Sequence, residues 1–309
     1  MIFTAKQVQE KCREQNMDLY QCFIDLKKAF DTVNREALWK ILRKIGCPEK
    51  FVSMVEALHG GMKAWVNVSG NLSDPISVEN GVKQGDILGP TLFSLYFSMV
   101  FRDAFKNCRG GIYIRYRTTG KLFNLRRFEA KTKSFNQLVR DLLYADDCDL
   151  VTHTEADMQH LMDCISKSCK AFGLTISIEK TEVMFQPAPG NPYAEPSILV
   201  DGKRLKVVES FEYLGSKLNN SCTLDNEIPS RIQKATQALR SLEDHCWKKR
   251  SIKQATKISI YSTCVLPCLL YACQTWVPYR HHIKVLERFH QRSLRRIMNV
   301  HWKSFVPDT

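Results

Sequence analysis

The sequence predicts an α+β fold, because strand and helix patterns alternate over its first two thirds and helical patterns alone fill the remainder. Residues 19–24 form a short apolar stretch typical of a strand. Residues 142–151 form two short apolar arms on either side of an Asp-Asp pair, as in a hairpin. After residue 223 the texture becomes helical and basic, with one apolar stripe made by Leu224, Ile228, Ile232, Leu239 and Leu242.

The remaining elements follow from local signals along the chain. Residues 4–16 and 30–45 have helical patterns, and Gly46 and Pro48 end the second helix. Short strands are expected at residues 64–68 and 76–78, and a largely apolar, buried helix at residues 91–105. Thr154 is the expected N-cap of the following helix. Residues 186–196, rich in Pro and Gly, are expected to form a surface loop.

Composition limits the class of protein. The chain has 309 residues, of which 44% are hydrophobic and 10% aromatic, so it can bury a core and disorder is not expected. Its formal net charge of +13 and its pI near 9.2 indicate a polyanionic partner. Nucleic acid and an anionic membrane surface both fit this charge. A basic but otherwise ordinary protein is the alternative.

The 12 cysteines do not suggest a disulfide framework or a zinc finger, because no CxxC pair occurs among them. The first residues, MIFTAKQVQEKCREQ, lack the apolar run of a secretory signal, so reduced cysteines are expected. The longest apolar stretches lie around residues 92–100 and 265–277, well short of the roughly 20 residues of a membrane span. We therefore expect an intracellular, soluble protein of the nucleus, the cytoplasm or both.

Two segments concentrate positive charge. Between residues 106 and 137 basic residues are opposed by one acid, Glu129, and we expect a basic loop or hairpin there. In the last helix a basic row is spaced by four, four and three residues, and consists of Lys284, Arg288, Arg292 and Arg295. Such a row is most often a solvated face, but this segment has few acids, which favours phosphate contact.

Two groups of acids have the pattern of a metal site. Asp25 ends the predicted strand at residues 19–24, where an isolated Asp would most often cap a helix. Asp146 and Asp147 lie at the tip of the predicted hairpin, where Asp is also common. Adjacent carboxylates repel, and a bound cation relieves this. If the two strands are neighbours, these acids could hold two Mg²⁺ ions roughly 4 Å apart, as phosphoryl transfer requires.

A loop with glycines at 81, 85 and 89 leads into the apolar helix and includes Gln84. Loops of this kind let the backbone approach a ligand closely, and a purely structural turn is the alternative.

In this order the pieces resemble the motifs of reverse transcriptases, with wording closest to the non-LTR (LINE-type) retrotransposons. Residues 23–31 (FIDLKKAFD) are similar to motif A, residues 80–93 (NGVKQGDILGPTLF) to motif B, and residues 144–147 (YADD) to motif C. Residues 173–181 are similar to motif D and residues 211–216 to motif E. The resemblance covers residues from about 4 to 303. It implies a right-hand polymerase palm with partial fingers (residues 1–220) and a mostly helical, basic thumb (residues 221–309).

The resemblance also implies a role for each matching residue. Asp25 and Asp146 would be the principal ligands of two Mg²⁺ ions, with Asp147 in support; Mn²⁺ is a possible substitute. Gln84 and Gly85 would pack against template and incoming nucleotide. Lys180 would protonate the leaving pyrophosphate, although an exposed structural lysine is the alternative. The primer grip, contacting nucleic acid, would include Phe211, Tyr213, Leu214 and Gly215.

Phe30 occupies the position that blocks a ribose 2′-hydroxyl in this family. RNA-dependent RNA polymerases place an acid there, so the aromatic side chain favours deoxynucleotides. The implied partners are an RNA template, a DNA primer and deoxynucleoside triphosphates, with no membrane and an unknown oligomeric state.

Two features depart from the family pattern. Asp86 stands where Cys or another small residue is usual, and its carboxylate would repel nucleotide phosphates. The chain also begins inside or after the fingers segment that carries the triphosphate-clamping Arg, and we expect a truncated fingers end without endonuclease or zinc knuckle.

Two functions from different classes are therefore expected. The first is RNA-directed DNA polymerase activity. The alternative is a catalytically inactive remnant that binds RNA or DNA through its basic face. A membrane-surface role is disfavoured, since the basic helix has no large Trp, Phe or Leu insertion face.

Overall fold

The computed structural model describes residues 1–106, 108, 110–117 and 134–300. The chain forms two compact units. The first unit consists of Met1 and Lys11–Glu209, and the second of Ile2–Glu10 and Ser210–Thr309. The helix α1 (Ile2–Glu14) therefore contributes to both units.

The first unit is built on a five-stranded sheet in the order β13-β10-β1-β9-β8. The central strand β1 (Leu19–Ile24) runs antiparallel to β10 (Glu182–Gln186) and to β9 (Asp147–Thr152). The edges are β8 (Asp141–Tyr144), antiparallel to β9, and β13 (Lys206–Val207), parallel to β10.

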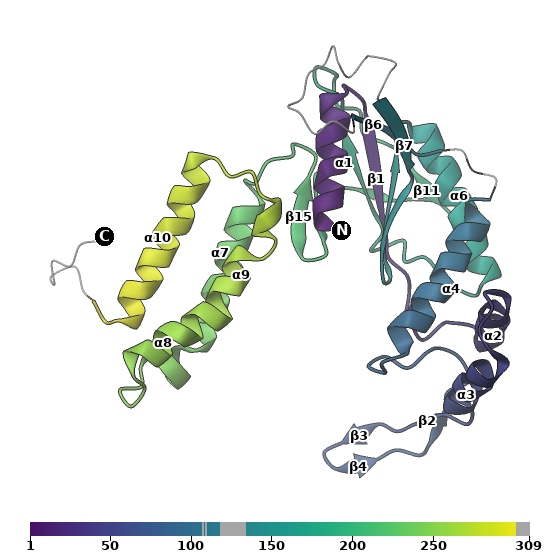
Figure 1. Cartoon of the computed structure of the whole chain (residues 1–309), viewed down its shortest axis with the longest axis horizontal. Helices are drawn as coiled ribbons and strands as arrows, with labels where there is room; N and C mark the ends of the chain where they lie inside the picture. Colours follow the sequence, from purple (N-terminus) through teal and green to yellow (C-terminus); the bar gives the residue numbers. More distant parts are fainter. Residues whose placement is uncertain (107, 109, 118–133, 301–309) are drawn as a thin grey trace. The chain divides into compact units, whose positions relative to one another are not determined.

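Helices bury one face of this sheet. Cys22, Ile24 and Leu150 of the strands share one hydrophobic core with α2 (Arg35–Lys44), α3 (Glu49–His59), α4 (Gly89–Ala104) and α6 (Glu155–Ala171). Figure 1 shows α4 and α6 beside the strands. Alternation along β1 explains this: Cys22 and Ile24 face the helices, while Gln21, Phe23 and Asp25 point to the opposite face.

Short hairpins complete the first unit. β2 (Lys63–Ala64) pairs with β5 (Ile76–Ser77), and β3 (Asn67–Val68) with β4 (Asn71–Leu72). β6 (Ile112–Arg117) pairs with β7 (Ser134–Val139), which confirms the hairpin expected in this basic segment; residues 118–133 lie outside the described residues. β11 (Leu199–Val200) pairs with β12 (Lys203–Arg204).

The second unit joins one hairpin to a group of helices. The hairpin consists of β14 (Ser210–Tyr213) and β15 (Ser216–Asn219). The helices are α7 (Glu227–Ser241), α8 (Gln254–Ile260), α9 (Leu266–Leu270) and α10 (Arg280–Ile297), with π-helical turns at Glu243–Trp247 and Tyr261–Val265 and a 3₁₀ turn at Cys273–Thr275. Leu239, Trp247, Tyr261, Val265 and Ile297 are buried in its core.

The α+β fold is confirmed, and the strand at residues 19–24 has the expected bounds. The helix expected from residue 30 begins instead at Arg35, because the Asn34 side chain caps it by accepting a 2.9 Å hydrogen bond from the Ala37 N–H. The Thr154 cap is confirmed, since its hydroxyl accepts from the Asp157 N–H at 3.1 Å. The helix α3 was not predicted.

The run Gln254–Thr275 is long and apolar enough to cross a membrane, with a mean hydropathy of 1.3. This corrects the expectation that no segment reaches such a length, which counted only the apolar stretch near residues 265–277. A single run of this kind is weak evidence for a membrane span, and its Tyr261, Val265 and Leu269 are buried in the core of the second unit.

Candidate active site

Asp25 lies at the end of β1, where its backbone is fixed on both sides. Its N–H donates to the Thr181 hydroxyl at 3.2 Å, and its carbonyl accepts from the Ser177 N–H at 2.8 Å. Two residues on, the Lys27 N–H donates to the Thr175 carbonyl at 2.9 Å. The segment similar to motif D therefore pairs directly with the segment similar to motif A.

Asp146 and Asp147 lie where β8 turns into β9. Tyr144 pairs with Asp147 across this turn, and Ala145 has a φ of 54°, which is uncommon for a residue with a Cβ. The register of β1 and β9 pairs Ile24 with Cys148. One step further, Asp25 stands level with Asp147, so the neighbouring strands bring these distant acids together.

The charges of these acids affect one another. Burial, with the negative charges of Asp146 and Asp25, raises the pKa of the Asp147 carboxyl above its ordinary value. The Oδ2 atom of Asp25 is shielded from solvent and accepts no hydrogen bond from the described residues. Repelling carboxylates with a shielded oxygen that accepts no hydrogen bond from the described residues fit a divalent cation, which prefers hard oxygen ligands.

Lys180 is the cation that the fold brings to this site. Its Nζ lies 3.6 Å from Asp25 Oδ2, and 73% of its side chain is exposed. Its backbone N–H donates to the Ser177 carbonyl at 3.2 Å, in the same turn that holds the Asp25 carbonyl. Lys180 thus lies beside Asp25 while its ammonium remains open to a ligand.

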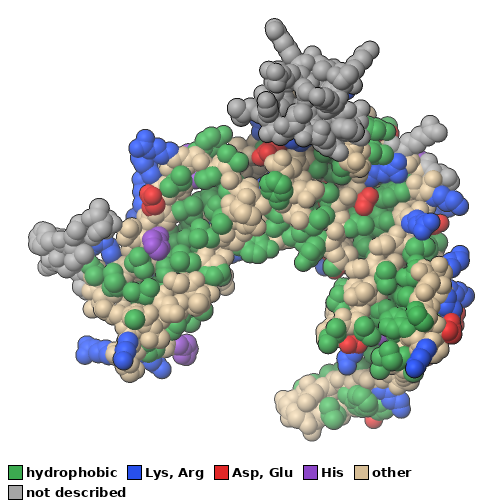
Figure 2. All heavy atoms as spheres, in the orientation of Figure 1, with side chains coloured by type: hydrophobic (Ala, Val, Ile, Leu, Met, Phe, Trp, Pro, Cys, Tyr) green, Lys and Arg blue, Asp and Glu red, His purple; other side chains and the backbone are tan. Residues whose placement is uncertain are grey.

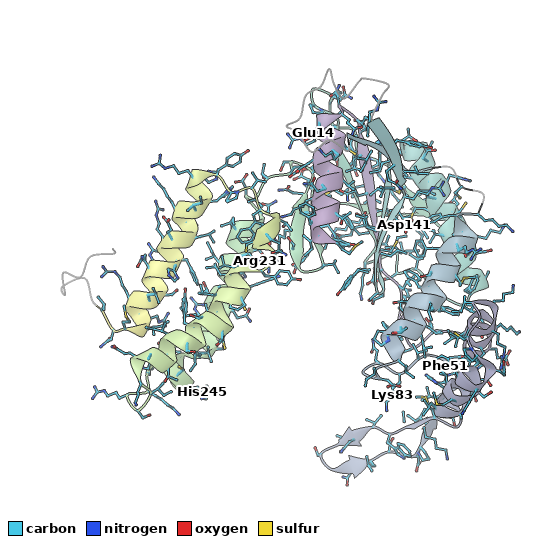
Figure 3. The ribbon with its side chains drawn as sticks, viewed as in Figure 1. Glu14, Phe51, Lys83, Asp141, Arg231 and His245 are labelled. Carbon is cyan, nitrogen blue, oxygen red and sulfur yellow. The ribbon has the colours of Figure 1, made fainter. Side chains whose placement is uncertain are left out.

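The glycine loop that holds Gln84 and Gly85 is anchored to the segment following Asp25. The Val82 N–H donates to the Phe30 carbonyl and the Gly81 N–H to the Val33 carbonyl, both at 2.8 Å. Gly81 has a φ of +86°, and a Cβ there would lie 2.7 Å from the Asp31 backbone, so only glycine fits. Figure 3 shows Lys83, which immediately precedes Gln84, in the loop that enters α4.

The Phe30 ring is held against α4. It stacks on Phe93 with ring centroids 4.5 Å apart, and its side chain is partly buried. The residue expected to face the nucleotide sugar is therefore positioned by the helix that follows the glycine loop.

Arg35 positions the same loop and was missed by sequence reasoning. Its guanidinium donates to the carbonyls of Gly81 and His59 at 2.8 Å and of Val78 at 2.9 Å. These bonds join α2 and α3 to the loop. A single Arg at the start of a helix gave no signal in the sequence, because its acceptors are backbone carbonyls far along the chain.

A second missed feature is a buried polar pair beside the acids. The Gln21 amide donates to Asp149 Oδ2 at 2.7 Å, and neither residue is exposed. Burial raises the pKa of Asp149 well above its ordinary value, although the Gln21 hydrogen bond opposes this. The third acid of the Asp146–Asp149 segment therefore differs in environment from the first two.

The predicted primer-grip residues form the β14–β15 hairpin of the second unit. Leu214 and Gly215 make its two-residue turn with φ angles of 48° and 79°, as in a type I′ turn. Tyr213 is buried, whereas Phe211 is partly exposed. The hairpin and the three acids belong to different units, each described separately.

A buried ion pair, also missed from the sequence, fixes this turn. Arg231 Nε lies 2.6 Å from Glu227 Oε1, and the guanidinium also donates to the Gly215 carbonyl. The Tyr271 hydroxyl donates to the Leu214 carbonyl at 2.9 Å, and its ring packs 4.7 Å from the Arg231 guanidinium carbon. Figure 3 labels Arg231 on α7.

The basic row of the last helix does form one surface. A shallow depression of about 540 Å³ along α10 is lined by Lys284, Glu287, Arg288, Gln291, Arg292 and Arg295. Lys and Arg side chains border the α10 region on the face drawn in Figure 2. The spacing of four, four and three residues therefore aligned these cations on one side of the helix.

Comparison with known proteins identifies the family of this site. The reverse transcriptase (RNA-dependent DNA polymerase) family matches residues 2–218, well over half of the chain. One similar protein is the Pol polyprotein of a type-1 R2 retrotransposable element from Popillia japonica, 24% identical over 90% of this chain and 42% of the relative. Another is the RNA-directed DNA polymerase of the mobile element jockey from Drosophila melanogaster, 22% identical over 91% of this chain and 28% of the relative.

The chain thus spans less than half of the length of these relatives. Among solved structures, the telomerase of Candida albicans in complex with a fragment of telomeric RNA is similar, with a TM-score of 0.50 and 12% identity. That similarity covers 98% of this chain and 52% of the telomerase, and it supports the polymerase fold. On its motifs, its fold and these relatives, the chain belongs to the reverse transcriptase family, in the branch of the non-LTR retrotransposons.

Proposed function

We propose that this chain catalyses RNA-templated DNA synthesis by metal-dependent nucleotidyl transfer. The observation that carries the proposal is the convergence of Asp25 with Asp146 and Asp147 at the ends of neighbouring strands. Membership of the reverse transcriptase family supports the reaction, the nucleic-acid template and the use of divalent metal ions.

Asp25, Asp146 and Asp147 would hold two Mg²⁺ ions, which Mn²⁺ can replace. When bound, such ions supply activation of the primer 3′-hydroxyl and neutralise charge on the triphosphate. Lys180, with its ammonium near Asp25, would donate a proton to the leaving pyrophosphate oxygen. Gln84 and Gly85 would contact template and incoming nucleotide from a loop that Arg35 and the Phe30 carbonyl hold in place.

The proposed substrates are a primed RNA template and deoxynucleoside triphosphates, and the primer is DNA. Phe30 supports the deoxynucleotide, since its ring is held by stacking on Phe93 and would stand against a ribose 2′-hydroxyl. The β14–β15 hairpin, with Phe211, Leu214 and Gly215, would contact the primer strand.

Primer extension on an RNA template tests the proposal. The wild-type chain with Mg²⁺ and deoxynucleoside triphosphates should extend the primer, and Asp146→Asn should lose at least about 1,000-fold in rate through the loss of charge at the metal site. Asp163→Asn is the matched control, because this exposed acid lies on α6 away from the site.

Asp163→Asn should retain the wild-type rate. Failure of the wild-type chain to extend any primed RNA template, with either Mg²⁺ or Mn²⁺, would contradict the proposal. Equal rates for wild type and Asp146→Asn would exclude Asp146 from the chemistry.

A second candidate function is nucleic-acid binding without synthesis. The basic surface of α10 favours it, because four cations on one face can contact consecutive phosphates. Salt-sensitive binding to RNA or DNA by a chain that extends no primer would support this function in place of the first.

A further inference from the structure

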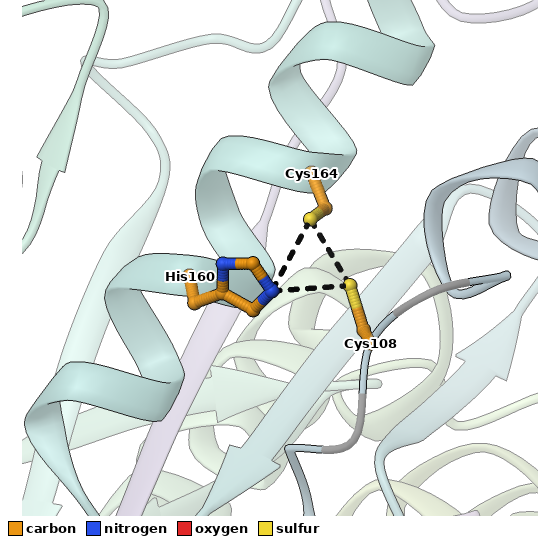
Figure 4. A group of neighbouring side chains, drawn as sticks. All are labelled: Cys108, His160 and Cys164. Atoms are coloured by element: carbon orange, nitrogen blue, oxygen red, sulfur yellow. Dashed lines mark hydrogen bonds between the residues drawn. The ribbon is translucent and has the colours of Figure 1, made fainter.

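Two cysteines and a histidine come together in the first unit, where the segment after α4 lies beside α6. They are Cys108, His160 and Cys164. Cys108 lies in the turn after α4, where its thiol donates to the Ala104 carbonyl at 3.3 Å. His160 and Cys164 are four residues apart on α6 and therefore share one face of that helix. All three ligand atoms lie within 4.8 Å of one another (Figure 4). We propose that these three side chains bind a zinc ion.

The distances between the donor atoms support this ion. His160 Nε2 lies 3.8 Å from the sulfur of Cys108 and 3.8 Å from that of Cys164. Around a tetrahedral zinc ion with Zn–S of about 2.3 Å and Zn–N of about 2.0 Å, nitrogen and sulfur ligands stand about 3.5 Å apart and two sulfurs about 3.8 Å apart. The two sulfurs, now 3.0 Å apart in a thiol contact, would have to separate by roughly 0.8 Å to take this geometry.

The donor set selects the class of metal. Two thiols and an imidazole are soft to borderline ligands that suit Zn²⁺, whereas Mg²⁺ and Ca²⁺ require oxygen. The site is therefore chemically distinct from the Asp25, Asp146 and Asp147 carboxylates. Binding exchanges the two thiol protons for one divalent ion, so the metallated site is neutral.

The environment of the three residues allows an ion to enter and remain. Cys108 is buried and Cys164 is half-buried, whereas His160 is exposed. The exposed imidazole leaves a route from solvent, and the buried Cys108 shields one side of the ion from water. Among the described residues the group has three donors, which leaves the fourth tetrahedral position to water or another external ligand.

The other His-containing group in the described part of the chain lacks these properties. In the second unit His282 accepts from the Tyr279 N–H at 3.2 Å through Nδ1 and contacts Asp225 at 3.0 Å through Nε2. Both ring nitrogens of His282 are thus engaged in holding the start of α10. Its partners explain that group without a metal.

Zinc at the first group would connect α4 to α6. The helix α4 follows the glycine loop, and α6 packs against it in the core. A metal bridge from the segment after α4 to the middle of α6 would restrain both elements in the manner of a short cross-link. Zinc binding at this site would affect stability and does not depend on the proposed polymerase activity.

Metal analysis of the full-length chain, purified under reducing conditions with no histidine tag, tests the proposal. The wild-type chain should bind one equivalent of Zn²⁺, and Co²⁺ in its place should give thiolate-to-cobalt charge-transfer absorption, which carboxylate ligands cannot produce. Cys164→Ser and His160→Gln each remove a ligand, so each should weaken Zn²⁺ binding by more than the roughly 10- to 100-fold caused by losing a hydrogen-bond partner of a ligand. Cys273→Ser, an exposed cysteine of the second unit, is the matched control and should bind like wild type.

His160→Gln decides the question if Cys164→Ser fails to fold, since its side chain is exposed. Addition of Zn²⁺ should also raise the Tm of wild type and of Cys273→Ser but not that of His160→Gln. Unchanged Zn²⁺ affinity and cobalt absorption in His160→Gln would overturn the proposal. A Cys108–Cys164 disulfide, found by peptide mapping of the chain purified under reducing conditions and supplied with zinc, would overturn it as well.

Discussion

Asp149 shows how acids close together in the sequence acquire different properties. Asp146 and Asp147 lie at the turn, where a ligand can reach them, whereas Asp149 pairs with Phe23 across β1 and is fully buried. Among the described residues its carboxyl accepts a hydrogen bond from the neutral amide of Gln21 and from no cation, so desolvation dominates and favours the protonated acid. Asp149 therefore supports the strand pair without being able to ionise easily.

Asp149→Asn should reduce the pH dependence of stability. The folded chain keeps the Asp149 proton that the unfolded chain releases above its ordinary pKa of 3.8, so the free energy of unfolding falls as the pH rises from 3.8 towards the raised folded pKa. The uncharged amide has nearly the same shape and removes this contribution. Urea unfolding between pH 4 and pH 7 in EDTA should give a flatter profile for the variant. Superimposable profiles would show that Asp149 ionises normally.

Phe30→Val should weaken discrimination against ribonucleotides if the proposed polymerase function holds. Loss of the ring that stacks on Phe93 opens space beside the nucleotide sugar, so the ratio of kcat/KM for deoxynucleotide over ribonucleotide should fall by about 10- to 100-fold. Phe51→Val, which also trims a core-packing ring but on α3 (Figure 3), should leave the ratio unchanged. An equal fall in both variants would indicate general loosening of the core.

At the scale of residues, the sequence predicted the acids of the site better than the residues that hold the site in place. Asp25 and the Asp146-Asp147 pair stood out because each interrupts an apolar pattern, and β1 and β9 are indeed neighbours. Arg35, Gln21 and Arg231 gave no comparable signal. Each acts through partners fixed by long-range packing, such as the Gly81 carbonyl for Arg35, and no local pattern specifies those partners.

At the scale of elements, a buried ion pair on α7 stabilises the β14–β15 turn. The Glu227 and Arg231 side chains are 1% and 5% exposed, and Glu227 also accepts from the Lys217 N–H at 2.6 Å. The helix α7 thus holds the turn and β15 through one buried ion pair. Breaking such a pair leaves a charge buried without a partner.

Arg231→Met should lower the free energy of unfolding by about 3–5 kcal/mol, because it removes the ion-pair partner of the buried Glu227 carboxylate and the guanidinium donor of the Gly215 carbonyl. Lys234→Met on the same helix is the control. Its ion pair with Glu212 is about half exposed, so its loss should cost less than about 1 kcal/mol. Urea denaturation monitored by tryptophan fluorescence gives both values. Similar losses in the two variants would mean that burial adds nothing to the Arg231 pair.

Element boundaries were predicted less well than element types. Phe30 and Val33 have the apolar spacing of a helical face and pack against the core, but both precede the start of α2 at Arg35. The helix α3 buries Val52, Val55 and His59 but follows directly on Pro48, the residue expected to end the preceding helix. Periodicity reports burial, and burial occurs in turns as well as in helices.

At the scale of the whole molecule, part of the net charge of +13 is concentrated on one surface of α10. The α10 surface carries four aligned cations, with Glu287 the one acid that lines the same depression. The formal charge alone was equally compatible with nucleic acid and with an anionic membrane. The family supports nucleic acid, and binding through phosphates makes a quantitative prediction about salt.

The double variant Arg288→Ala/Arg292→Ala should bind RNA with a weaker salt dependence than wild type. Each phosphate contact contributes a slope of about −0.7 to −0.9 to log K against log [salt], so removing both cations should reduce the magnitude of the slope by about 1.4 to 1.8. Lys249→Ala/Arg250→Ala removes the same net charge from an exposed turn outside α10 and controls for overall electrostatics. Fluorescence anisotropy with a labelled RNA, at salt concentrations from about 50 to about 300 mM, measures both slopes. If the two double variants lose the same slope, the cations act through the general charge of the chain, and α10 is not a phosphate-binding surface.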